Sequence, residues 1–253
     1  MTHLKHCLLL FTLLLSACAK LTTPLTGDYR ATIEINGGEI PLQLRVTTEN
    51  EATQVWLLQN DEMLPATEVQ VKDNNLYATL PAGAGQLKAS ISRNALKGEL
   101  QLTDPQGKVH HFPFSAQLNK TYRFIEQSST DNADVSGFWQ LTANSPDHFS
   151  APVTLHLKQT FDAIDGKLII NQNNETLTVY GQTHGDEVYF GGIGAGRAVL
   201  FKGRVNTQGQ LEGQLWINAS NGTAALATAI KDVEPDTQDG LRQVALPWAV
   251  PTR

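Results

Sequence analysis

The chain has 253 residues, of which 41% are hydrophobic and 17% are charged, with 20 glycines and 11 prolines. This composition is typical of globular domains and excludes a disordered chain, a collagen-like chain and a membrane protein with many spanning helices. The formal net charge is −6, and lysine and arginine do not form runs, so nothing favours contact with the phosphates of a nucleic acid. We therefore expect no nucleic-acid partner.

The first 17 residues have the layout of a secretory signal peptide. Lys5 gives the start a positive charge, a largely apolar run of nine residues extends from Cys7 to Leu15, and small residues follow. A helix that spans a bilayer needs about 20 apolar residues. The run is therefore too short to act as a stable transmembrane anchor.

The signal segment ends in Leu15-Ser16-Ala17-Cys18, which resembles the cleavage site of bacterial lipoproteins. The resemblance implies cleavage before Cys18 and attachment of lipid, including palmitate, at its thiol. Several acyl chains anchor a protein firmly, because each buried CH₂ contributes about 0.8 kcal/mol. The next residues are Ala19 and Lys20 rather than Asp, and the sorting rules of bacteria with two membranes then imply the outer membrane, facing the periplasm. The alternative is an ordinary signal peptide with a cysteine at the cleavage site.

The sequence contains two cysteines, Cys7 and Cys18. Cys7 leaves with the signal peptide, and the thiol of Cys18 carries the lipid. This interpretation excludes disulfides, Cys-X-X-Cys redox chemistry and zinc sites built on thiolates.

The rest of the chain contains the same motifs twice, in the same order. The paired segments are Thr26–Tyr29 with Ser136–Trp139, Pro41–Val46 with Pro152–Leu157, Leu76–Tyr77 with Val188–Tyr189, Gly83–Gly85 with Gly194–Gly196, and Leu96–Leu100 with Leu211–Leu215. The offset is 110 to 112 residues for the first four pairs and 115 for the last, which indicates one insertion. This pattern predicts a tandem duplication.

The duplication predicts a division of the chain into six parts. These are a signal peptide (1–17), a lipidated tether (18–25), a first β module (26–118), a polar linker (119–135), a second β module (136–231) and a C-terminal tail (232–253). Each module has enough residues for its own core, so we expect the two modules to fold separately.

Within each copy, apolar and polar residues alternate as they do in half-buried strands. Leu42, Leu44 and Val46, for example, alternate with polar residues. Turn signals between such runs, including Asp165-Gly166, predict short antiparallel strands, and hence an all-β chain of two small barrels or sandwiches. The segment Thr223–Lys231 is rich in alanine, but it stands where a last strand would close the second module, so we expect a strand there.

The two copies resemble the duplicated non-catalytic region that precedes the redoxin domain in thioredoxin-like disulfide oxidoreductase lipoproteins of bacteria. The motifs that carry this resemblance are Gly27-Asp28-Tyr29, Pro41-Leu42, Phe112-Pro113-Phe114, Arg123-Phe124, Phe138-Trp139, Val199-Leu200-Phe201 and Gly209–Leu215. The redoxin domain with its Cys-X-X-Cys motif is absent from this sequence, so the resemblance implies no catalytic residue. The G-x-W of the second copy is also similar to the first strand of lipocalins and avidins, whose barrels enclose small ligands.

The motifs that could carry chemistry have simpler structural interpretations. The glycine-rich segment Gly191–Arg197 lacks the third glycine of a dinucleotide loop and is followed by a strand pattern, which favours a hairpin turn. His110 and His111 are adjacent, so on a strand they point to opposite faces and cannot converge on one ion. We therefore assign no catalytic, cofactor-binding or metal-binding residue.

The expected function is that of a non-catalytic, lipid-anchored protein of the cell envelope. It would act as a binding or scaffold module with an envelope protein as partner, and the family resemblance adds an accessory role beside thiol-redox proteins. Two alternatives remain open. One is a lipocalin-like carrier of a small apolar ligand, and the other is a hydrolase whose carboxylates come from distant strands, which a single sequence does not reveal.

Comparison of the two copies also predicts one contact surface. An ungapped alignment at the Gly-Ala-Gly motif pairs Lys88 with Val199 and Ser90 with Phe201, so the second copy is apolar where the first is polar. The predicted surface consists of Tyr189, Val199, Phe201 and Trp216. We expect this surface to pack on the first copy or on the tail, or to bind a partner protein.

Overall fold

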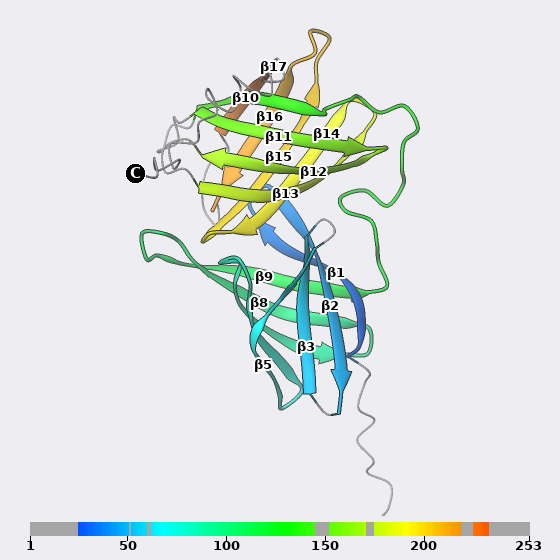
Figure 1. Cartoon of the computed structure of the whole chain (residues 1–253), viewed down its shortest axis with the longest axis vertical. Coiled ribbons are helices and arrows are strands. Elements are labelled where there is room, and N and C mark those ends of the chain that lie inside the picture. Colours follow the sequence, from blue (N-terminus) through cyan, green and yellow to red (C-terminus); the bar gives the residue numbers. More distant parts are fainter. Residues whose placement is uncertain are drawn as a thin grey trace, which may run out of the picture.

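The computed structural model describes residues 25–50, 52–59, 62–144, 152–170, 175–218 and 225–232. The signal peptide, Cys18 and the tail beyond Asp232 lie outside the described residues. The described part of the chain consists of strands, turns and an irregular linker, in two tandem β modules (Figure 1). This confirms the predicted all-β fold with two modules.

The first module is one strongly curved antiparallel sheet. Its strands are β1 (Gly27–Ile35), β2 (Gly38–Glu49), β3 (Ala52–Gln59), β4 (Glu62–Pro65), β5 (Thr67–Lys72), β6 (Asn75–Leu80), β7 (Gly85–Ser92), β8 (Ala95–Thr103) and β9 (Val109–Leu118). The order across the sheet is β4-β3-β2-β1-β9-β8-β7-β6-β5. The edge strands β4 and β5 are joined only by Ala66, whose N–H donates to the Val55 carbonyl at 2.8 Å. Since this single residue connects the two edges of the sheet, the edges lie close together and the sheet nearly closes into a barrel.

The second module is a closed barrel of eight strands. They are β10 (Gly137–Asn144), β11 (Pro152–Thr160), β12 (Ala163–Ile170), β13 (Glu175–His184), β14 (Glu187–Gly194), β15 (Arg197–Val205), β16 (Leu211–Ile217) and β17 (Ala225–Asp232). Strand β17 pairs with both β10 and β16 and so closes the barrel. The described part of the alanine-rich segment is therefore a strand, as predicted, and ladders on both sides hold its backbone.

Tyr29 and Trp139 hold equivalent positions in the two modules. Each aromatic side chain is buried and donates a hydrogen bond to the carbonyl four residues earlier, at 2.9 and 2.8 Å respectively. The glycine two residues before each ring has a positive φ, 149° at Gly27 and 122° at Gly137, which favours glycine. The segments Thr26–Tyr29 and Ser136–Trp139 share the motif [ST]-G-x-[YW], which is thus explained by a backbone requirement and a buried, hydrogen-bonded ring.

The expected turn at Asp165-Gly166 is wrong. Both residues lie inside β12, and the hairpin between β11 and β12 turns instead at Phe161 and Asp162. A Cβ at Gly166 would lie 2.5 Å from the carbonyl oxygen of His156 on β11. Glycine is therefore required here by a close approach between strands, not by a turn.

The two modules are docked on one another through the outer face of β14, β15 and β16. Four residues of this face, Ile193, Ala198, Leu200 and Trp216, belong to the same hydrophobic cluster as the core of the first module. The Trp216 ring lies against the β1–β2 turn, where a Cβ at Gly37 would be 2.4 Å from a ring carbon. Beside it, the N–H groups of Ala195 and Gly196 donate to the carbonyls of Ala82 and Gly83, at 2.8 and 3.1 Å. The modules therefore share a buried interface.

Candidate functional site

The four residues of the predicted contact surface do not share one face. Tyr189 and Trp216 point out of the barrel, where Tyr189 stacks on Phe124 of the linker with ring centroids 5.8 Å apart. Val199 and Phe201 point inward and are fully buried in the barrel core. The prediction is therefore wrong for Val199 and Phe201.

The error comes from the ungapped alignment of the copies. Strand pairing places Lys88 opposite Tyr77 and Lys202 opposite the equivalent Tyr189. Lys88 therefore corresponds to Lys202, three residues beyond Val199. A shift by an odd number of residues moves every side chain of a strand to the other face.

The outward Tyr189 is held by its own strand as well as by the linker. Its hydroxyl donates to the Glu187 carboxylate at 2.9 Å. Partial burial of the ring, together with this hydrogen bond to a charged neighbour, raises the pKa of Tyr189 to about 12. The hydroxyl therefore stays protonated over the physiological pH range, and Tyr189 acts as a packing residue.

Side chains fill the described interior of the barrel. Phe190 and Phe201 stack with centroids 4.6 Å apart and planes at 10°, and Trp139 is buried beside the cluster they belong to. A barrel of eight strands has an interior just wide enough to be filled by its own side chains or to hold one small ligand. Here buried aromatic side chains take up part of that interior.

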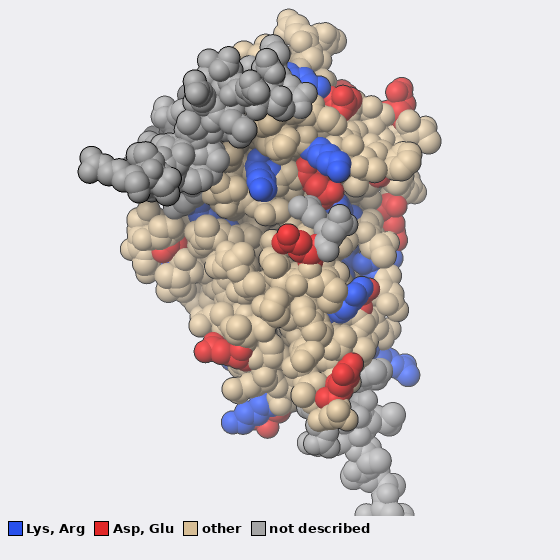
Figure 2. All heavy atoms as spheres, viewed as in Figure 1, with Lys and Arg blue, Asp and Glu red and all other residues tan. Residues whose placement is uncertain are grey.

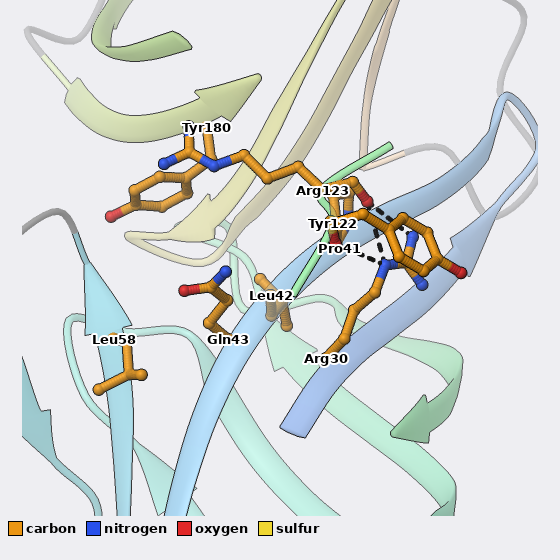
Figure 3. Close-up of a pocket in the computed structure, with 8 residues that line it drawn as sticks. All are labelled: Arg30, Pro41, Leu42, Gln43, Leu58, Tyr122, Arg123 and Tyr180. Carbon is orange, nitrogen blue, oxygen red and sulfur yellow. Dashed lines mark hydrogen bonds between the residues drawn. The ribbon is translucent and has the colours of Figure 1, made fainter. Parts of the chain in front are cut away.

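The junction of the modules contains a small pocket that is built around two arginines (Figure 3). Arg30 of β1 donates through Nε to the carbonyls of Tyr122 and Arg123 at 3.0 and 3.1 Å. Arg123 in turn donates to the Asp165 carboxylate at 2.8 Å and to the Gly181 carbonyl at 3.2 Å. The two guanidinium groups therefore tie the linker to both modules.

This junction pocket has a volume of about 40 Å³. The Tyr180 hydroxyl is buried there and has no hydrogen-bond partner within the described part of the chain. Burial, and to a lesser degree the charge of Asp165, raises the pKa of Tyr180 above its ordinary value. A volume of this size has room for a few water molecules only, so the pocket is too small for a substrate.

A much larger groove lies on the outer face of the first module, over β5 to β8. Its volume is about 460 Å³, and it is lined by Glu68, Gln70, Tyr77, Ala78, Thr79, Gln86, Leu87, Lys88 and Gln101. The Lys88 ammonium lies 6.0 Å from the centre of the Tyr77 ring. The Thr79 hydroxyl donates to the Glu68 carboxylate at 2.7 Å. The groove is thus polar, with one aromatic ring, and it lies within the usual size range of ligand sites, about 300–1,000 Å³.

The two neighbouring histidines of β9 behave as the alternation predicted. His110 is buried, with Nε2 2.9 Å from the Asp104 carboxylate, while Nδ1 of the exposed His111 is 2.9 Å from Glu99. Among the residues that the structure describes, no three His, Cys, Asp or Glu side chains gather closely enough to hold a metal ion.

Phe161 is an exposed and strained residue that sequence reasoning missed. It stands at the tip of the β11–β12 hairpin, 90% exposed, with φ of 58°. The left-handed region costs an L-residue about 1–2 kcal/mol, and the exposed ring regains nothing from burial. Because the turn was predicted at Asp165-Gly166, Phe161 was not recognised as a turn residue.

Replacement of Phe161 by glycine is expected to stabilise the protein by up to about 1 kcal/mol, because glycine removes the strain at positive φ but loses more entropy on folding. Thermal unfolding followed by circular dichroism measures the change. Phe161→Ala is the matched control, since alanine removes the ring but keeps the Cβ that causes the strain. Equal melting temperatures for the two variants would show that the strain is absent.

Comparison with known proteins gives no assignment. No family model matches the chain, and no curated protein matches it. Among solved structures, a protein of unknown function of the DUF3598 family from Nostoc punctiforme has 11% sequence identity and a TM-score of 0.28, over 82% of this chain and 96% of that chain. The proposals below therefore rest on the residues and geometry of this chain.

Proposed function

We propose that this chain is a lipid-anchored protein of the bacterial cell envelope that acts by binding, as a rigid body of two docked β modules. The observation that carries the proposal is the shared core: Leu200 and Trp216 of the second module are buried against the first. The stacking of Phe190 on Phe201 inside the barrel also supports it, because aromatic rings packed in the interior leave the outer surface of the module as the face for a partner.

The proposed anchor is Cys18, at the end of the lipoprotein-like motif. No helix among the described residues has the length and apolar character needed to cross a bilayer. The tether, residues 18–25, would reach at most about 25–30 Å at 3.3–3.6 Å per residue. An anchored chain would therefore hold its first module close to the membrane surface.

Replacement of Cys18 by alanine is expected to move the protein from the membrane fraction to the soluble fraction, because the acyl chains supply the membrane affinity. Fractionation of cells that express wild type and Cys18→Ala, with labelled fatty acid, measures both location and lipidation. Cys7→Ala is the matched control and is expected to stay on the membrane. Incorporation of labelled lipid into Cys18→Ala would refute the proposed anchor.

Crosslinking in intact envelopes tests the proposed binding role. A photoreactive side chain at Gln86, in the groove, is expected to form a discrete adduct, whereas one at the exposed Gln117 of β9 is not. Native mass spectrometry of the purified chain then addresses the carrier alternative. A bound small apolar molecule, together with no adduct at Gln86, would replace the binding role with that of a carrier.

A further inference from the structure

The groove of the first module and the docking face of the second are the same surface of the repeated fold. Strand pairing aligns the cross-strand row Thr79, Gln86, Gln101 with the row Gly191, Leu200, Trp216. The pair Tyr77 and Lys88 aligns in the same way with Tyr189 and Lys202. Five residues that line the groove therefore have exact counterparts on the docking face.

In the second module this surface is occupied. Trp216 packs on Gly37 of the β1–β2 turn, and a Cβ at the next residue, Gly38, would lie 2.5 Å from the Lys202 ammonium. Leu200 is buried in the shared core, and Tyr189 stacks on the linker. The fold thus uses this sheet face for docking in one of its two copies.

In the first module the same face is open and its chemistry is different. The tyrosine and the lysine are retained as Tyr77 and Lys88, but Gln86 stands in place of Leu200 and Gln101 in place of Trp216. Amide side chains do not favour the apolar hairpin contact seen in the second module. They favour an occupant that forms hydrogen bonds.

The two charged side chains that line the groove have opposite signs, so the lining itself favours neither an anion nor a cation. Lys88 and Glu68 carry opposite charges, and Glu68 already accepts the Thr79 hydroxyl. Over the face in Figure 2, positive and negative side chains are likewise interspersed. The remaining polar groups of the lining are the Tyr77 hydroxyl and three carboxamides. The Gln101 carboxamide donates to Glu99 at 3.0 Å and keeps its oxygen free to accept, and those of Gln70 and Gln86 have no hydrogen-bond partner in the described part of the chain.

A carboxamide offers both a donor and an acceptor, which matches the hydroxyl groups of a sugar. The Tyr77 ring adds an apolar platform for the face of a sugar ring. We propose that this groove binds a neutral glycan, with a sugar ring on Tyr77 and its hydroxyl groups at Gln70, Gln86 and Gln101. The inference rests on the proposed binding function and specifies its ligand class.

Saturation-transfer NMR with the full chain in detergent tests the proposal. The probes are three soluble tetrasaccharides at millimolar concentration, namely chitotetraose, cellotetraose and maltotetraose. At least one is expected to receive saturation from the protein, and its affinity is expected to fall about tenfold in Tyr77→Ala and in the double variant Gln86→Ala with Gln101→Ala. The matched control, Gln117→Ala, is expected to bind as wild type does. Circular dichroism confirms that each variant is folded, and the double variant, whose side chains are exposed, keeps the test valid if Tyr77→Ala unfolds.

Three results would overturn the glycan proposal. The first is the absence of saturation transfer to all three probes, and the second is an affinity that is unchanged in the double variant. The third is concentration-dependent self-association of the wild type in sedimentation, lost in Lys88→Glu, which would identify a second copy as the occupant. Fractionation of Cys18→Ala does not depend on a glycan. A protein adduct at Gln86 together with no saturation transfer would refute the glycan and leave the proposed binding function standing, whereas the absence of both would refute both.

Discussion

Replacement of Phe201 by alanine is expected to lower the free energy of unfolding by about 3–5 kcal/mol, the usual cost of truncating a buried phenylalanine. The side chain is fully buried and stacks on Phe190. Its ring also covers two glycines, since a Cβ at Gly203 or Gly213 would lie 2.7 or 2.8 Å from its Cζ. Because glycine has no side chain, neither residue can fill the cavity that removal of the ring would leave. Urea unfolding monitored by circular dichroism measures the loss.

Phe161→Ala is the matched control for this experiment. It removes the same aromatic ring from an exposed position, so its free energy of unfolding is expected to change by less than about 0.5 kcal/mol. Equal effects of Phe161→Ala and Phe201→Ala would contradict the inward orientation of β15. They would also restore the outward contact surface predicted from the sequence.

Replacement of Gly37 by alanine is expected to destabilise the docked modules by about 1–3 kcal/mol, as overpacking does. The new Cβ would lie 2.4 Å from the Trp216 ring. The φ of Gly37 is not positive, so the backbone itself accepts alanine and the clash is the main cost. Trp216→Ala alone is expected to cost about 3–5 kcal/mol, because the indole is buried.

The double variant separates the clash from other effects. If Gly37 and Trp216 touch, Gly37→Ala adds little in the Trp216→Ala background, and the cycle gives a coupling of about 0.5–3 kcal/mol. Urea unfolding of the four proteins measures it. Strict additivity would mean that this turn and this ring are apart in solution.

Local pattern alone was enough to predict the class of fold. Alternation of apolar and polar residues sets the strands, and the repeated [ST]-G-x-[YW] motif marks where each module begins. The alanine-rich end of the second module was correctly assigned to a strand because closure of the sheet requires one there. The alternation and the motif depend on neighbours in sequence, and the closing strand was inferred from the repeat, so a single sequence records all three.

The orientation of β15 could not be obtained in that way. Its residues Ala198 to Phe201 are all apolar and all buried, because one face lines the barrel and the other meets the first module. Alternation of apolar and polar residues distinguishes a buried face from a solvent-exposed face. It gives no information when both faces of a strand are buried. An alignment error of three residues then exchanged the two faces.

The sequence by itself determined an all-β chain of two tandem modules and the positions of most of its strands, since these follow from the two-residue period of strands and from the repeat. Only the tertiary structure decided that Trp216 and Leu200 are covered by the first module while Gln101 and Gln86, their counterparts, line an open groove. The physical reason is that exposure depends on which surfaces meet. The contact of Gly37 with Trp216 joins residues far apart in the chain, and no local period encodes it.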